Sequence, residues 1–157
     1  MSIVTDLVRR DREYGELFST VLANFSASKP FPVAASGLSD GASDAVYASL
    51  LCDLAEKGKG RRSIIVCAEE KECVRLCDTL SQFGVPAVFF QSRDLNLYNI
   101  TASHEYEHER LRVLYKLLRG ETAVVVTTPD GALGYTMPRE SLRAHSLRVD
   151  YDTYASY

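Results

Sequence analysis

One stretch of the chain, Ala123-Val124-Val125-Val126-Thr127, has the clearest strand pattern in the sequence. An unbroken run of apolar and β-branched side chains is typical of a strand that is buried on both faces of a sheet. Three shorter runs have a similar character: residues 31–35 (Phe-Pro-Val-Ala-Ala), 63–67 (Ser-Ile-Ile-Val-Cys) and 87–90 (Ala-Val-Phe-Phe). We expect all four runs to form strands.

Helical patterns alternate with these runs. Apolar side chains at three- and four-residue spacing predict a first helix with a stripe from Tyr14 to Phe25 and a second helix that begins near Ser43. Further helices are expected at residues 69–83, 104–118 and 129–133. The alternation predicts an α/β fold: an open, mostly parallel sheet with helices on both faces. In such sheets, ligands bind at the carboxyl ends of the strands.

The composition suits a globular domain. The chain has 157 residues, of which 46% are hydrophobic and 25% charged, and its net charge is −3. This balance argues against a nucleic-acid-binding surface, which needs clustered lysine and arginine. No apolar run approaches the roughly 20 residues of a membrane span, and the N-terminus does not begin as a signal peptide. The four cysteines fit reduced thiols in a cytoplasmic protein without a membrane partner.

A glycine-containing loop lies between the first expected strand and the second expected helix. Residues 37–44 read Gly-Leu-Ser-Asp-Gly-Ala-Ser-Asp. This is the setting of the phosphate-binding loop of a P-loop NTPase, whose pattern is Gly, four residues, Gly, Lys and then Ser or Thr. In that pattern the lysine reaches the terminal phosphates and the hydroxyl binds magnesium. The alternative is an ordinary strand-to-helix turn.

The loop residues do not supply the chemistry of phosphate binding. Counted from Gly37, and with Gly41 inside the loop, the second glycine of the pattern falls on Ala42. The lysine falls on Ser43 and the hydroxyl on Asp44. Two anionic groups about 4 Å apart repel by roughly 1 to 4 kcal/mol, so Asp44 opposes a phosphate that no lysine neutralises. We interpret these five residues as a vestigial phosphate loop, and we expect no bound cofactor, catalytic residue or metal ligand.

Residues 104–108, His-Glu-Tyr-Glu-His, match the zinc-metalloprotease pattern. On a helix, His104 and His108 share a face and can chelate zinc, with Glu105 as general base. Glu140 is the candidate third ligand. However, the histidine that extends this motif in many zinc proteases is missing, and the apolar stripe of the helix begins only after it. The alternative is an acid-rich helix start that faces solvent.

The cysteines and the strand ends do not suggest a metal site. Cys73 and Cys77 share a helix face with Leu76 and Leu80, which indicates buried thiols rather than ligands. The last predicted strand ends at Thr127, without the acids that would hold magnesium in a motor ATPase.

The C-terminal part of the chain departs from the strand–helix alternation. A short helix at 139–144 and a strand near 146–149 are expected there, and no closing element follows. We therefore expect residues 1–135 to form the α/β domain and residues 136–157 to begin a following domain of a longer protein.

With these elements placed, the chain resembles the N-terminal region of a known family, the bacterial transcription-repair coupling factor Mfd. The segments that carry the resemblance are residues 37–39, 63–68, 75–78, 94–98, 109–114, 124–129 and 145–149. The resemblance covers most of the chain, from Leu7 to Val149, and depends on the order and spacing of these segments. One departure is the loop at 93–98, where the family has tryptophan and proline.

The resemblance implies a P-loop NTPase-like fold similar to the first domain of the damage-verifying protein UvrB, with a degenerate loop that has lost nucleotide binding. It also implies that the full-length protein is an ATP-dependent DNA translocase that displaces stalled RNA polymerase and recruits UvrA for nucleotide excision repair. In the family, ATP, magnesium and DNA belong to motor domains beyond this region, which the first domain contacts. We carry no UvrA-contacting residue over to this chain.

Three functions follow from the sequence. The leading hypothesis is a non-catalytic scaffold of a coupling factor that supports UvrA recruitment and restrains the motor. The second is an active P-loop ATPase of the UvrB or helicase type with an atypical loop. The third is a zinc hydrolase at His104 and His108.

Overall fold

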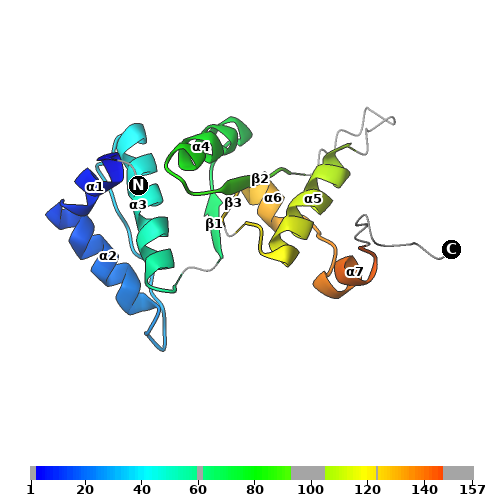
Figure 1. Cartoon of the computed structure of the whole chain (residues 1–157), viewed down its shortest axis with the longest axis horizontal. Coiled ribbons are helices and arrows are strands. Elements are labelled where there is room, and N and C mark those ends of the chain that lie inside the picture. The colour runs from blue at the N-terminus through cyan, green and yellow to red at the C-terminus, as the bar shows by residue number, and fades with distance from the viewer. Residues whose placement is uncertain (1–2, 60–61, 93–104, 123, 147–157) are drawn as a thin grey trace, which may run out of the picture.

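The computed structural model describes residues 3–59, 62–92, 105–122 and 124–146 (Figure 1). In chain order, the elements in these ranges are α1 (Ile3–Arg9), α2 (Arg12–Asn24), α3 (Asp40–Glu56), β1 (Ser63–Val66), α4 (Glu70–Gln82), β2 (Ala87–Phe90), α5 (Glu105–Arg119), β3 (Val124–Thr127), α6 (Pro129–Leu133) and α7 (Arg139–Ala144). None of these helices has the length and apolar character needed to cross a bilayer.

The three strands form one parallel sheet in the order β1-β3-β2. Val124 of β3 is aligned with Ser63 of β1 on one side and with Ala87 of β2 on the other. The chain passes from β1 to the far edge of the sheet through α4 and returns to the centre through α5. This arrangement confirms the α/β fold with a parallel sheet, and it confirms the strands expected from the last three apolar runs.

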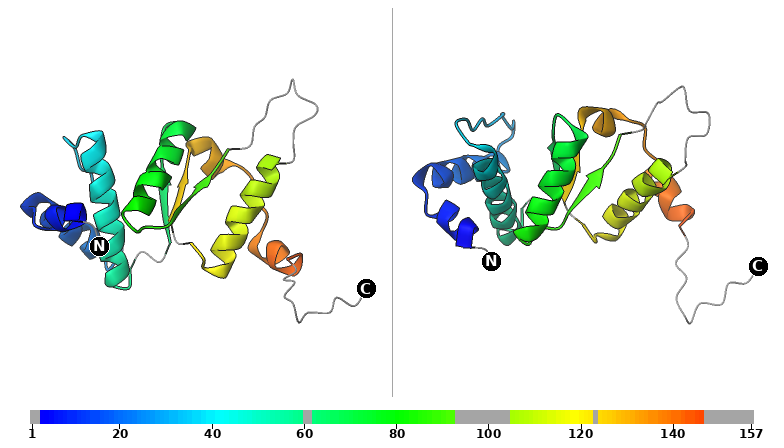
Figure 2. Two further views of the ribbon diagram at one scale, coloured as in Figure 1. Left: turned by 45° about the horizontal axis from the view of Figure 1, so that its top comes forward. Right: turned by 90° about the horizontal axis from the view of Figure 1, so that it is seen from above.

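The two faces of the sheet carry separate apolar cores. On one face, Val124 and Val126 pack with Leu76 of α4. On the other face, Val125 packs with Val113 of α5. Figure 2 shows α4 and α5 on opposite sides of the strands, so the expected covering of both faces is confirmed. All four residues of β3 are buried, as the unbroken apolar run predicts.

The strand expected at residues 31–35 is wrong. This segment has no regular secondary structure, and its side chains are exposed. The Asn24 side chain forms hydrogen bonds with both backbone groups of Phe31. Its amide nitrogen donates to the Phe31 carbonyl at 2.7 Å, and its oxygen accepts from the Phe31 N–H at 3.0 Å. Pro32 has no N–H to offer a ladder. The glycine loop therefore does not follow a strand.

The N-terminal region contains two helices where the sequence predicts one. The expected helix is confirmed as α2, and α1 before it is an addition that the sequence analysis missed. Asp11 separates them, because its side chain accepts a hydrogen bond from the Tyr14 N–H at 3.0 Å and caps α2.

The remaining helices match the sequence predictions. The helices expected at 104–118, 129–133 and 139–144 correspond to α5, α6 and α7. The α7 helix packs against α5, and its Leu142 is buried. The loop at 93–98 and the strand near 146–149, apart from residue 146, lie outside the described residues.

Candidate functional site

The glycine-loop residues lie together at the start of α3, but the helix begins at Asp40 rather than near Ser43, so the second half of the expected loop is helical. Gly37 has a φ of 80°, in the left-handed region that favours glycine. Ser39 is the N-cap residue of α3, but its side chain makes no capping hydrogen bond. Gly41, Ala42 and the residues after them belong to the helix itself. The Ser43 hydroxyl turns back along α3 and donates to the Ser39 carbonyl at 3.2 Å.

Asp44 is the distinctive residue of this site, because it is a buried acid. Only 4% of its surface is exposed. Its carboxylate accepts hydrogen bonds from both terminal nitrogens of the Arg75 guanidinium, from Nη2 at 3.3 Å and from Nη1 at closer range. A paired guanidinium is what a buried carboxylate needs to be tolerated. The position that carries the magnesium-binding hydroxyl in a P-loop therefore carries an acid that ties α3 to α4.

The groove beside the loop is acidic. Residues 33–36, Leu38 and the start of α3 line it together with α1 and α2, and its volume is about 770 Å³. Among the described residues, its lining includes the carboxylates of Asp11, Glu13 and Glu16 but no lysine or arginine. Much of the remaining surface is apolar, with Leu7, Leu17, Val33 and Val46 among the lining residues. The groove is therefore suited to apolar groups and opposed to phosphate.

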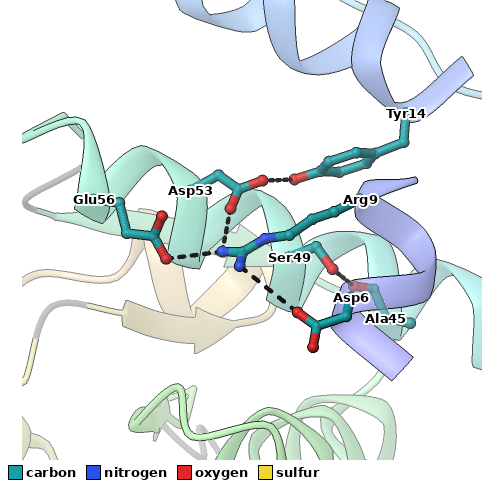
Figure 3. A network of polar contacts seen from close by, with 7 residues as sticks. All are labelled: Asp6, Arg9, Tyr14, Ala45, Ser49, Asp53 and Glu56. Atoms are coloured by element: carbon teal, nitrogen blue, oxygen red, sulfur yellow. Dashed lines mark hydrogen bonds and ion pairs between the residues drawn. The ribbon is translucent and has the colours of Figure 1, made fainter. Parts of the chain in front are cut away.

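A polar network anchors α1 and α2 to α3 beside this groove (Figure 3). Arg9 of α1 pairs with Asp53 and with Glu56, the latter at 2.9 Å, and approaches Asp6 at 4.0 Å. The Tyr14 hydroxyl of α2 donates to Asp53 at 2.5 Å. Burial and this bond to the Asp53 carboxylate raise the pKa of Tyr14 well above its usual range. These contacts hold the helices that line the groove in place. This network was not predicted from the sequence.

Internal hydrogen bonds occupy the carboxyl edge of the sheet, where ligands of α/β proteins usually bind. The Thr127 hydroxyl donates to the Phe90 carbonyl at 2.6 Å, and the Thr128 hydroxyl accepts from the N–H of Gly131 to cap α6. The Arg110 guanidinium lies 4.1 Å from the centre of the Phe90 ring and donates to the Gln91 carbonyl at 2.5 Å. These polar groups thus hold β2, β3, α5 and α6 together.

Only part of the zinc-metalloprotease motif lies in the residues that the structure describes. His104 lies outside the described residues, while His108 and Glu107 are exposed on the first turns of α5. Glu140 is exposed on α7. The described part of the chain contains no group of three histidine, cysteine or acidic side chains that is placed to hold a metal ion.

The cysteines are thiols, as the sequence predicts. Cys67 and Cys73 belong to the core beneath α4, and Cys77 is half-buried beside them. Burial raises the pKa of Cys67 to about 12 and that of Cys77 to about 11. The thiolate is the nucleophile and the metal ligand, so these side chains serve as apolar packing groups at neutral pH.

Comparison of the chain with protein-family models, with curated proteins and with solved structures found no match.

Proposed function

We propose that this chain is a non-catalytic scaffold, the first domain of a transcription-repair coupling factor. One observation carries the proposal: Asp44, at the sequence position where the P-loop pattern has its magnesium-binding hydroxyl, is buried and already paired with Arg75. Binding of a phosphate at this position would have to separate Asp44 from Arg75. The Asp44 carboxylate would then remain buried without a compensating charge.

The charge around the loop supports the same proposal. The neighbouring groove is lined by three carboxylates, Asp11, Glu13 and Glu16. Glu16 is paired with Arg12 at 3.1 Å, and an unpaired carboxylate about 4 Å from a phosphate repels it by roughly 1 to 4 kcal/mol, depending on the dielectric. Among the described residues, the groove lining supplies no lysine or arginine to attract a nucleoside triphosphate.

The wider role follows from the resemblance to the coupling factors. In this proposal the chain works in the cytoplasm as part of a larger protein whose motor domains bind ATP, magnesium and DNA. It contacts those motor domains, and the whole protein engages RNA polymerase and UvrA. Its own contribution is a rigid α/β body without turnover.

Two measurements test the proposal. The chain should release no phosphate from ATP above background in the presence of magnesium. Release that a Gly37→Val substitution abolishes would instead identify an active P-loop ATPase. The complete gene product should bind purified UvrA in a pull-down, and failure to do so would count against the recruitment role.

A further inference from the structure

In the part of the chain that the structure describes, β1 is an edge strand of the sheet. In the described ranges it pairs only with β3, while its other side has no partner strand. The Cys67 N–H donates to the Thr127 carbonyl at 2.9 Å, which fixes the direction of the backbone groups along β1. Because these groups alternate from one residue to the next, the N–H and C=O of Ile64 and Val66 point away from β3.

The side chains of the same two residues are exposed. Ile64 is 71% exposed and Val66 is 54% exposed, although both stand in a sheet whose central strand is buried. The register places Ile64 beside Val125, so both side chains lie on the face that α5 covers. The α5 helix covers β2 and β3 on that face but leaves β1 bare.

A cleft of about 220 Å³ continues from Ile64 across this face. Phe90, Val125 and Leu117 are among its lining residues. A second cleft of about 290 Å³ shares Leu117 and Arg62 with the first and continues to Leu142 of α7. The bare edge therefore borders an apolar depression that can receive side chains.

Two arginines border this surface. Lys57, Lys59 and Arg62 precede β1 in the sequence, and Arg62 and Arg139 line the cleft. Within the described residues, none of these four side chains forms an ion pair, whereas Arg9, Arg75 and Arg119 all do. The surface is complementary to a partner that combines apolar side chains with a negative charge.

We propose that β1 is a docking edge for an extended, acidic–apolar peptide segment of a partner protein. The segment adds as a fourth strand and pairs with the outward N–H and C=O groups of Ile64 and Val66. Alternate apolar side chains lie in the cleft, and carboxylates at the start of the segment lie beside Arg62.

The test uses a fluorescent peptide, Asp-Glu-Val-Thr-Val-Thr-Val, titrated into the whole chain and followed by anisotropy. We expect saturable binding, and a peptide with lysine in place of both acids should bind at least about tenfold more weakly. Hydrogen exchange should slow at the amides of Ile64 and Val66 on binding. A peptide methylated at alternate backbone nitrogens should not bind.

Two variants of the chain distinguish pairing of the peptide with β1 from nonspecific binding to the surface. Val66→Pro removes an outward N–H and leaves the ladder to β3 intact, so it should abolish binding. Ile64→Glu, at an exposed position, should weaken binding at least about tenfold through charge repulsion and loss of apolar contact. The control Val74→Lys, on the 47% exposed side chain of α4, should leave the affinity unchanged. Melting curves of all three variants establish that they are folded.

Several outcomes would overturn the proposal. These are no binding at millimolar peptide, binding without protection of the Ile64 and Val66 amides, and equal affinity for the acidic and lysine peptides. Displacement of the peptide by a single-stranded oligonucleotide would assign the basic surface to nucleic acid instead.

Discussion

Asp44 and Arg75 form a salt bridge that joins the first turns of α3 to the middle of α4. The carboxylate is buried, whereas about half of the Arg75 side chain is exposed. The two partners are therefore unequal: the arginine can return to water if its partner is lost, but the acid cannot. The pair ties α3 to α4 and places a neutral ion pair, rather than a free cation, at the start of α3.

This inequality predicts an order of stability among variants. Asp44→Asn removes the buried charge, and Arg75 can rehydrate, so the free energy of unfolding should fall by about 1 to 2 kcal/mol. Arg75→Met leaves the Asp44 carboxylate buried without its partner and should cost more, about 3 kcal/mol. Urea denaturation of both variants measures the difference. Equal losses, or a larger loss for Asp44→Asn, would contradict the burial of the acid.

Substitution by alanine should change the free energy of unfolding in opposite directions at Gly131 and Gly41. A Cβ at Gly131 would stand 2.3 Å from the Thr127 hydroxyl oxygen and 3.0 Å from the Phe90 carbonyl oxygen, whereas one at Gly41 would meet nothing within 4 Å. Gly131→Ala should therefore lower the free energy of unfolding by about 1 to 3 kcal/mol. Gly41→Ala should raise it by up to about 1 kcal/mol, because Gly41 is helical. Denaturation curves decide this, and a destabilised Gly41→Ala would indicate an unrecognised constraint at the loop.

Because its thiols are buried, the folded chain should lose stability as the pH rises above about 9. The pKa of Cys67 is about 12 in the folded chain, whereas an ordinary thiol, as in the unfolded chain, has one of 9.0. The unfolded state therefore releases a proton from about pH 9 upward that the folded state keeps, and the free energy of unfolding falls through this window. Between the two pKa values the slope approaches about 1.4 kcal/mol per pH unit for the Cys67 thiol.

Urea denaturation of the chain and of Cys67→Ala across this pH range isolates the effect. The variant should show the shallower dependence, since other alkaline groups titrate in both proteins. Parallel curves would mean that Cys67 ionises freely in the folded state.

The sequence predicts most of the sheet but not its extent. The runs that form β1, β2 and β3 are recognisable because β-branched side chains are continuous and Gly84 and Gly120 end the preceding helices. The run at 31–35 has similar hydrophobicity, yet the Asn24 side chain holds Phe31 outside the sheet. These hydrogen bonds join a helix end to a residue seven positions later. The apolar periodicity from which strands are predicted does not reveal them.

The candidate site could be predicted only in part. The lack of a lysine and the presence of Asp44 are visible in the sequence, and the structure adds the partner of the acid. Arg75 is separated from Asp44 by a whole strand and turn, so no local pattern links them. The same holds for Arg9 and Asp53, which meet only because α1 packs across α3.

Isothermal titration of the chain with ATP and magnesium decides whether the start of α3 excludes nucleotides. If the start of α3 opposes phosphate, no binding heat should appear up to about 1 mM nucleotide, which corresponds to a binding free energy weaker than about −4 kcal/mol. A saturable isotherm with a micromolar dissociation constant, lost on Gly37→Val substitution, would contradict the scaffold account.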